Sequence, residues 1–290
     1  MRIPESELII NGDGSVFHLH IRPEQLADKV ILVGDPERVP VFEDYFERIE
    51  ARGASREFVW ITGLYGGTRM TVLSTGIGTD NIDIVMTELD ALANVNFATR
   101  EEKGEHKTLT IVRLGTCGAI QPDIPLGSFV LSHYSIGFDG LLNWYANRNR
   151  ITDSDMEGCF MKHMAWPVEL PFPYFVHASD KLIDAFKEKT VKGMTISSPG
   201  FYGPQGRVVR QQLAMCNMLN DIESFRYGNW KITNFEMEGS AIAGFAKQLG
   251  HDAVTVCCVI AHRYLKDVNT DYKPRVKELI TLVMDTMSSL

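Results

Sequence analysis

The stretch Ile111-Val112-Arg113-Leu114-Gly115-Thr116-Cys117-Gly118-Ala119-Ile120 joins an apolar run to a segment with two glycines. It continues an apolar run, 109–114, that is typical of a buried strand. A buried, unpaired guanidinium is costly, so Arg113 is expected to meet an anion. Gly115 and Gly118 would let the backbone pass close to a ligand at the carboxyl edge of the sheet, where open α/β folds bind ligands. The alternative is an arginine paired with a nearby carboxylate, followed by a turn that needs glycine.

The composition is that of an ordinary globular protein. The 290 residues are 44% hydrophobic and 23% charged, with a formal net charge of −8. This charge argues against a nucleic-acid or anionic-membrane surface, because each of these favours a basic face. The five cysteines are odd in number and form no C-x-x-C motif, so neither a disulfide framework nor a zinc site is indicated. We expect no signal peptide, no membrane-spanning segment and a cytoplasmic location.

Apolar strands alternate with amphipathic helices along the chain. The predicted strands are 16–20, 29–33, 56–61, 69–74, 109–114, 128–136, 193–197 and 253–261, and the predicted helices are 37–46, 80–92, 181–188, 239–250 and 274–290. The two histidines within 16–20 lack a nearby third ligand, which favours a strand over a metal site. We expect a surface loop at 97–107 and an excursion or lid at 139–175. The alternation, without linker or repeat, indicates one α/β domain spanning residues 1–290.

Other polar groups follow predicted strands. Arg38 stands in the first turn of a helix after Gly34, which is a plausible anion site, although it could also be a solvated residue. The glycine- and proline-rich stretch 199–207 carries an aromatic, an amide and a guanidinium, as binding loops often do. Its alternative is a surface loop with Phe201 in the core. A further arginine, Arg263, ends the strand 253–261.

Two carboxylates flank a methionine in Glu236-Met237-Glu238, just before a predicted helix. Glu238 and Ser240 could serve the helix N-terminus, where negative charge is favoured. Alternatively, Glu238 could accept hydrogen bonds from a vicinal diol such as a sugar presents. The residues alone leave these two roles open.

Taken together, these motifs resemble the nucleoside phosphorylase family, and most closely the bacterial uridine phosphorylases. The resemblance runs nearly end to end, with the motifs in the family's order. They are Val16-Phe17-His18-Leu19, Gly34-Asp35-Pro36-Glu37-Arg38, Arg56-Glu57-Phe58, Ser74-Thr75-Gly76-Ile77-Gly78, the stretch 113–120, Phe201 with Gln205 and Arg207, Phe235-Glu236-Met237-Glu238, and Arg263. The resemblance implies an α/β/α sandwich around a central mixed, partly closed β-sheet.

The resemblance also implies roles for individual residues. Phosphate would be held by Gly34, Arg38, Arg113 and Thr116, with Arg56 from a neighbouring subunit. The ribose would contact Met237, Glu238 and, from the neighbour, His18. The base would meet Gly118, Phe201, Gln205, Arg207 and Arg263. Of these, Arg113, Glu238, Arg207 and His18 would be the catalytic residues.

The implied reaction is the reversible phosphorolysis of uridine to uracil and ribose 1-phosphate in pyrimidine nucleoside salvage, with deoxyuridine and thymidine as open further substrates. Phosphate is a co-substrate and no cofactor is implied. The implied assembly is at least a homodimer, with a trimer of dimers as the larger option. Purine-specific relatives typically place an aspartate near His262-Arg263, and this chain has no acid there. A purine or broad-specificity phosphorylase is the alternative, followed by a non-catalytic nucleoside-binding relative.

The chain departs from the family in three places. Thr79-Asp80-Asn81 stands where bacterial relatives often have Gly-Pro-Ser. In those relatives this segment helps to form a monovalent-cation site with the residues that match Glu57 and Ile77, so a cation near Glu57, Ile77 and Asn81 is left open. The 97–107 loop and the 145–175 region are also longer than in the closest bacterial enzymes, which leaves assembly beyond the dimer open.

Overall fold

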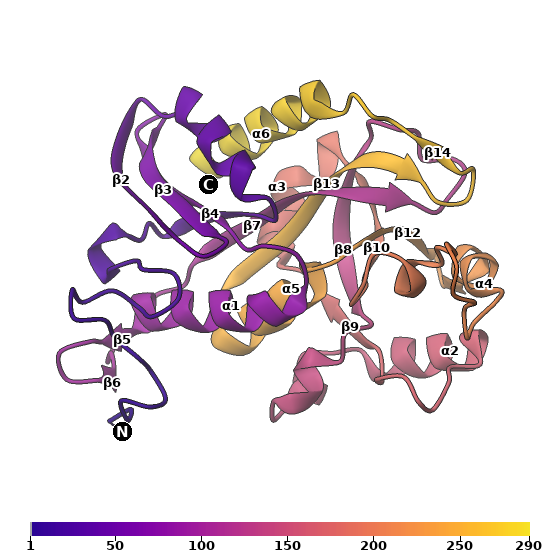
Figure 1. The fold of residues 1–290 in the computed structure, drawn as a ribbon, viewed down its shortest axis with the longest axis horizontal. Helices are drawn as coiled ribbons and strands as arrows, with labels where there is room; N and C mark the ends of the chain where they lie inside the picture. Colours follow the sequence, from indigo (N-terminus) through magenta and orange to yellow (C-terminus); the bar gives the residue numbers. More distant parts are fainter. Residues whose placement is uncertain (1) are drawn as a thin grey trace.

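Strand β7 (Thr110–Ala119) lies at the centre of the sheet in a computed structural model that describes residues 2–290 (Figure 1). It pairs in parallel with β1 (Lys29–Val33) on one side and with β13 (Asp252–His262) on the other. All of β7 is buried except the half-buried Thr116. Because both faces of the strand are covered, its sequence forms a nearly continuous apolar run.

The sheet is mixed and closes partly on itself. Its order is β11-β12-β10-β8-β13-β7-β1-β4-β3-β2, and an additional antiparallel pairing joins β12 to β7. The further strands are β2 (Arg48–Ser55), β3 (Phe58–Tyr65), β4 (Thr68–Ser74), β8 (Phe129–Gly137), β9 (Tyr174–His177), β10 (Val191–Ser197), β11 (Arg226–Tyr227), β12 (Trp230–Glu236) and β14 (Asp267–Val268). This confirms the predicted α/β class with a mixed, partly closed sheet.

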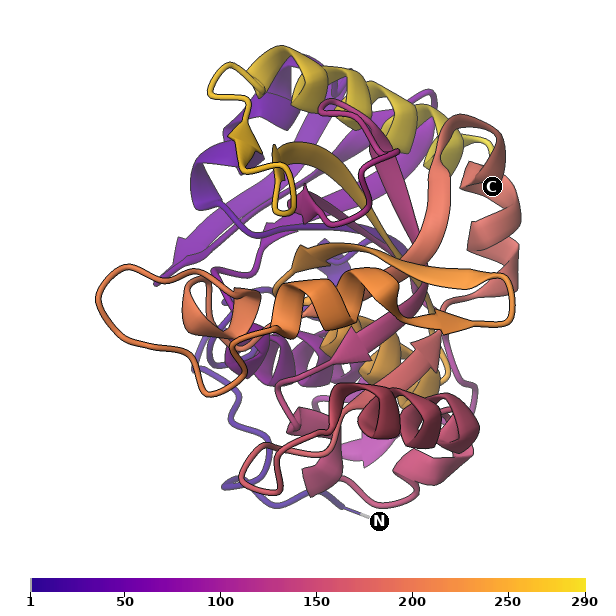
Figure 2. The ribbon, with the colours of Figure 1, turned by 90° about the vertical axis from the view of Figure 1, so that its right-hand side faces the viewer.

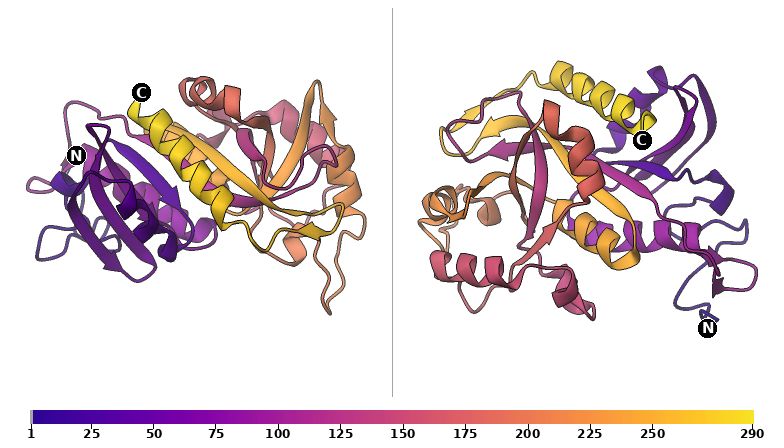
Figure 3. Two further views of the ribbon diagram at one scale, coloured as in Figure 1. Left: turned by 90° about the horizontal axis from the view of Figure 1, so that it is seen from above. Right: turned by 180° about the vertical axis from the view of Figure 1, so that it is seen from behind.

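Helices cover both faces of the part of the sheet around β1 and β7 (Figures 1 and 3). Helices α1 (Thr79–Asn94) and α5 (Gly239–Leu249) pack on one face, and α3 (Asp180–Phe186) and α6 (Lys273–Ser288) on the other. The alternation of β1 follows this division: Val30 and Leu32 join the α1 and α5 core, whereas Ile31 and Val33 join the α6 core. Within residues 2–290, no helix is long and apolar enough to cross a membrane.

A third core lies between the sheet at β8, β10 and β12 and two helices, α2 (Ser154–Met164) and α4 (Met218–Ser224). Figure 2 shows both helices beside this part of the sheet. The predicted excursion at 139–175 therefore holds a helix and returns as β9, which pairs with β8. Asp153 begins α2 by accepting the Met156 N–H at 3.0 Å. The short 3-10 helices are η1 (Pro23–Gln25), η2 (Pro36–Asp44), η3 (Leu141–Trp144), η4 (Arg148–Arg150), η5 (Lys187–Lys189) and η6 (Gly203–Gln205).

Three local predictions were wrong in detail. The helix predicted at 37–46 is the 3-10 helix η2, which ends at Asp44, and Pro40 within it lacks the N–H that an α-helix would use. The predicted strand at 16–20 is a turn, in which the Val16 N–H donates to the Ile21 carbonyl at 3.0 Å. The predicted loop at 97–107 contributes to a short hairpin of β5 (Val95–Asn96) and β6 (Glu101–Glu102).

Candidate active site

A pocket of about 830 Å³ opens at the last residues of β1, β7, β12 and β13. It brings together most of the predicted site: Gly34, Arg38, Arg113, Thr116, Gly118, Phe201, Gln205, Arg207, Met237, Glu238 and Arg263. Two predicted residues, His18 and Arg56, are absent from its lining in the part of the chain that the structure describes. The strand ends place side chains from distant parts of the sequence around one cavity, as expected for a site at the carboxyl edge of a sheet.

Arg113 is buried beside two carboxylates. Its Nη2 donates to Glu238, and its Nη1 lies 3.1 Å from Glu236 Oε2 and 3.3 Å from the sulfur of Cys257. Burial alone would lower the pKa of Arg113, but the charges of Glu236 and Glu238 outweigh it and raise the pKa. The structure thus shows the carboxylate pairing that the sequence left as the alternative, and contact of Arg113 with phosphate stays a prediction.

Gly115 and Gly118 make room for arginine side chains. A Cβ atom at Gly115 would collide with the Arg113 guanidinium, and one at Gly118 would lie 3.0 Å from Cγ and Cδ of Arg263. The expectation that these glycines bring the backbone to a ligand is therefore incomplete, since neighbouring arginines take the space. Gly118 still lines the pocket.

One end of the pocket is lined by Gly34, Arg38 and Thr116. Asp35 caps η2 by accepting the Glu37 N–H at 2.9 Å, which sets the start of the helix that carries Arg38. Burial lowers the pKa of Arg38, and the positive charge of Arg113 lowers it further. The negative charge of Asp35 raises the pKa, but only enough to offset part of this shift. A desolvated cation that is incompletely compensated gains from an anion, so this end of the pocket is suited to bind one.

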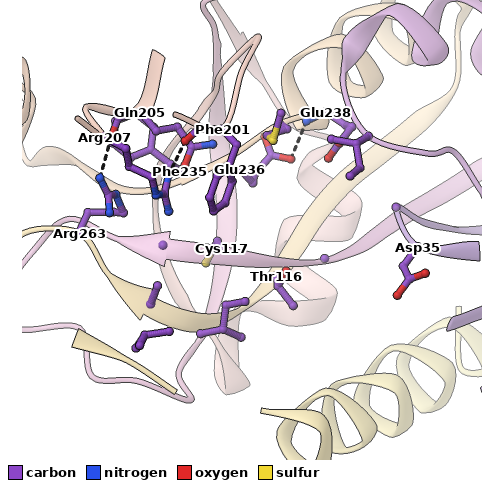
Figure 4. A pocket seen from close by; sticks show the side chains of 18 of the residues that line it. Asp35, Thr116, Cys117, Phe201, Gln205, Arg207, Phe235, Glu236, Glu238 and Arg263 are labelled. Carbon is purple, nitrogen blue, oxygen red and sulfur yellow. Dashed lines mark hydrogen bonds between the residues drawn. The ribbon is translucent and has the colours of Figure 1, made fainter. Parts of the chain in front are cut away.

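At the other end, Arg207 and Arg263 converge on Gln205 (Figure 4). Arg207 lies 3.7 Å above the Phe201 ring and donates to Gln205 Oε1 at 2.5 Å. Arg263 Nη2 donates to the Gln205 carbonyl at 3.0 Å, and its buried Nε has no hydrogen-bond partner within residues 2–290. Burial, reinforced by the charge of Arg263, lowers the pKa of Arg207 to about 10. This end therefore offers donors and positive charge beside an aromatic ring.

Glu236 and Glu238 lie between these ends and bind different partners. Glu236 accepts the main-chain N–H groups of Glu238 at 2.9 Å and of Gly239 at 2.9–3.0 Å, and it also accepts the Ser197 hydroxyl. Glu236, rather than Glu238, thus serves the N-terminus of α5. Ser240, the other proposed helix-start residue, donates its hydroxyl to Asp139 at 2.9 Å.

Glu238 accepts the Gly78 N–H at 2.7 Å and is bound by Arg113. It makes no side-chain bond to the α5 main chain. Burial raises the pKa of Glu238, although the charge of Arg113 opposes the shift. The carboxylate is held in the pocket and does not cap the helix, and its contact with a ligand stays a prediction.

Several residues that line the pocket were given no role from the sequence, among them His262, Lys266 and Asp267. His262 lines it, but both ring nitrogens are in use: Nδ1 accepts the Leu265 N–H at 3.0 Å, so Nε2 carries the proton toward the Gln121 carbonyl at 2.9 Å. Asp267, in the exposed strand β14, lies at the rim. Nothing in the sequence pointed to Asp267, because the polar residues after Arg263 have the composition of an ordinary surface loop.

Arg56 and His18 lie elsewhere on the chain. Arg56 is exposed in the turn between β2 and β3, with a left-handed φ of 54°. His18 is half-buried in the turn at 16–20, where its Nδ1 lies 2.6 Å from Glu88 Oε1. Neither residue lines the pocket of its own chain, so each could serve a site only on another subunit.

The monovalent cation that the sequence left open would lie near Glu57, Ile77 and Asn81. Asn81 Nδ2 donates to Glu57 Oε1 at 3.0 Å, and a cation at these residues stays a prediction. Ile77 is largely exposed beside them. No group of three or more His, Cys, Asp or Glu side chains suited to a metal ion occurs within residues 2–290.

Comparisons with known proteins agree on one family. The profile of the phosphorylase superfamily matches residues 28–287. A nucleoside phosphorylase of Trypanosoma brucei, described as showing uridine phosphorylase activity, is 30% identical, with a TM-score of 0.89 and coverage of 98% of this chain and 100% of that chain.

Relatives known by sequence include enzymes for both kinds of base. The uridine phosphorylase of Thermococcus kodakarensis is 28% identical over 254 residues, which are 87% of this chain and 79% of the relative. A DeoD-type purine nucleoside phosphorylase of Oceanobacillus iheyensis is 24% identical over 273 residues, which are 93% of this chain and 98% of the relative. Since the superfamily profile spans most of the chain and the fold agrees throughout its length, this protein belongs to the phosphorylase superfamily.

Proposed function

We propose that the protein catalyses the phosphorolysis of uridine to uracil and ribose 1-phosphate. The observation that carries the proposal is the order of charged groups along the pocket. Incompletely compensated arginines stand at both ends, Arg38 at one and Arg207 with Arg263 at the other, and the buried carboxylate Glu238 lies between them. Phosphate, a pyrimidine dione and a ribose diol match these three parts in charge and hydrogen bonding.

In this assignment the enzyme aligns two substrates and stabilises charge. A phosphate oxygen attacks C1′ as the C1′–N1 bond breaks, and the bonding electron pair leaves with the base. Negative charge then spreads onto the uracil oxygens, where Arg207 and Gln205 can stabilise it. Glu238 holds the ribose hydroxyls as positive charge develops on the sugar. Orientation of two reactants in one pocket is worth about 7–11 kcal/mol in ideal cases, so no covalent nucleophile and no cofactor is required.

The same proposal assigns Arg56 and His18 to the site of a second subunit. Both lie outside the pocket of their own chain. An isologous dimer places the same surface patch of each subunit against the other, so each site could receive both residues from its partner. A homodimer is therefore the minimal active unit that we propose, in a cytoplasmic salvage reaction.

A purine or broad-specificity phosphorylase is the second candidate. Asp267 at the rim is the observation that favours it, because a carboxylic acid could protonate a purine ring nitrogen as the base leaves. Asp267 is exposed, whereas Gln205, Arg207 and Arg263 already supply donors for carbonyl oxygens. A non-catalytic nucleoside-binding protein is a weaker candidate, since every predicted arginine and Glu238 are retained.

A nucleoside panel tests the proposal. We expect phosphate-dependent release of uracil from uridine, with much slower release of hypoxanthine from inosine. Omission of phosphate is the control, because hydrolysis would continue without it. Faster release of hypoxanthine than uracil would establish the purine alternative, and binding of uridine without release of base would establish the non-catalytic one.

A further inference from the structure

Arg113 is shared between two buried carboxylates, Glu236 and Glu238. Its Nη1 lies 3.1 Å from Glu236 Oε2, and its Nη2 donates to Glu238. No more than 6% of any of these three side chains is exposed. With both carboxylates ionised, the buried cluster carries one net negative charge. A cluster in this state repels a dianion rather than attracting it.

The neighbouring groups at the phosphate end of the pocket do not remove this excess charge. Arg38 lines the same end, but Asp35 beside it carries the opposite charge. Two thiols also face the cluster. Cys257 on β13 lies 3.3 Å from Arg113 Nη1, and burial raises the pKa of Cys117 on β7, so that its thiol stays protonated and uncharged. Even the arginine proposed to come from a second subunit would only bring this end of the pocket to neutrality, before a dianion binds.

The two carboxylates differ in how well their charge is stabilised. Glu236 accepts main-chain N–H groups at the start of α5 and the Ser197 hydroxyl, and such donors favour the ionised form. Glu238 accepts the Gly78 N–H at 2.7 Å and is bound by Arg113. Burial raises the pKa of Glu238, and the charge of Arg113 opposes the shift. An anion that draws on the Arg113 charge therefore makes Glu238 the carboxylate that protonates first.

We infer that binding of an anion at the phosphate end of the pocket is coupled to the uptake of one proton by Glu238. The proton removes the excess negative charge and leaves the charge of Arg113 available to phosphate. When the nucleoside binds, its ribose hydroxyls donate to Glu238 and favour the ionised form again, so the proton is released. The inference rests on the proposed function and deepens it, because it states the charge at which the site accepts phosphate.

The test uses sulfate, which has the shape and the two charges of a phosphate dianion but does not itself titrate near neutral pH. Isothermal titration calorimetry of the whole protein gives the Kd for sulfate from about pH 5 to about pH 9. Below the pKa of Glu238 in the free protein the carboxyl group is already protonated, so the Kd should be constant. Above that pKa, uptake of one proton predicts that the Kd rises about tenfold per pH unit.

Glu238→Gln separates this proton from every other group that titrates. Glutamine carries no charge at any pH, so the variant should bind sulfate with a Kd that does not change with pH. One pH unit above the start of the wild-type slope, it should bind sulfate about tenfold more tightly than the wild-type protein. Glu157→Gln, a change at a similarly buried carboxylate in α2 that is bound to Arg148, is the matched control and should keep the wild-type slope.

Two further measurements support the comparison. Inorganic phosphate titrates itself, so with this second probe only the difference in slope between the wild-type protein and Glu238→Gln is used, and it should again correspond to about one proton. If Glu238→Gln does not fold, difference infrared spectroscopy of the wild-type protein replaces it. Sulfate added above the pKa of Glu238 should then produce the carbonyl band of a protonated carboxyl group.

Two outcomes would overturn the inference about Glu238. One is anion binding by the wild-type protein whose Kd for sulfate does not depend on pH. The other is a wild-type slope that persists in Glu238→Gln, which would assign the proton to another group such as His262. A wild-type protein that binds neither sulfate nor phosphate would instead overturn the proposed function, and the inference would fall with it, so the two failures are distinguishable.

Discussion

Glu238→Gln separates a ligand-binding role of this side chain from a structural one. Glutamine keeps the size of the side chain and one carbonyl oxygen, which can still accept the Gly78 N–H that lies 2.7 Å from Glu238 in the structure. Arg113 would lose one partner but retain Glu236, whose Oε2 is 3.1 Å away. The arginine is therefore not left as an unpaired buried charge, a situation that costs about 3–5 kcal/mol. Because burial also raises the pKa of Glu238, removal of its charge relieves part of a desolvation cost. We expect a loss of about 1 kcal/mol or less in the free energy of unfolding.

The effect on catalysis should be larger. A carboxylate can accept from both ribose hydroxyls, and a hydrogen bond to a charged group is worth about 1.5–3 kcal/mol. Loss of one such bond corresponds to roughly 10- to 150-fold in kcat/KM. 2′-Deoxyuridine offers only the 3′-hydroxyl, so the loss on this substrate should be clearly smaller.

The assay is steady-state release of uracil from both nucleosides beside a thermal melt. Glu236→Gln is the matched control, because Glu236 is equally buried but binds the main chain at the start of α5. It should lower the unfolding free energy by about 1–3 kcal/mol, more than Glu238→Gln does. A large stability loss in Glu238→Gln with unchanged turnover of uridine would refute the ribose-binding role.

Three further predictions concern the base, the second subunit and pH. Gln205→Ala and Arg207→Ala should each lower uridine turnover at least tenfold, about 1.4 kcal/mol, while the melting temperature changes little, and near-normal kinetics in both would contradict the base assignment. Arg56→Ala and Arg38→Ala should each be inactive alone and should regain activity when the two variants are refolded together. About half of the dimers are then hybrids with one intact site each, so roughly a quarter of all sites should be restored. Hybrid dimers without activity would exclude a shared site. Burial lowers the pKa of His133 to about 4, below about 6.5 in the unfolded chain, so protonation favours unfolding. Urea titrations should therefore show stability falling as the pH is lowered from about 6.5 toward about 4, and a His133→Phe variant with the same slope would contradict this.

The central sheet could be predicted from the sequence because its strands are buried on both faces. Strand β1 spans 29–33 in the structure as predicted, and its four apolar residues occupy both cores. The edge strand β2 was missed. Its sequence, RIEARGAS, alternates between exposed and half-buried positions without a fully buried residue, so it carries no apolar pattern. Helix α2 was missed for a related reason, since no clear period marks its short apolar stripe among charged residues.

The site could be predicted only in part, because its contacts join residues far apart in the chain. The sequence indicated that Arg113 needs a partner, but the partners Glu236 and Glu238 depend on the pairing of Phe235 with Gly118 between β12 and β7. That pairing closes the sheet and cannot be derived from local propensity. The position of Asp267 at the rim likewise depends on the pairing of β14 with β13.

The two glycines of β7 connect the local sequence to the layout of the whole pocket. Gly115 leaves the space that the Arg113 guanidinium occupies beside Glu236 and Glu238, and Gly118 leaves the space for the side chain of Arg263. Both positions pair with β13, at Cys257 and Ala261, so the side chains of Arg113 and Arg263 pass β7 at two different residues. A side chain at Gly115 would displace the charge that balances the carboxylates, and one at Gly118 would displace a donor from the opposite end. The spacing of these glycines in β7 therefore sets where the charged groups of the pocket can stand, before any ligand binds.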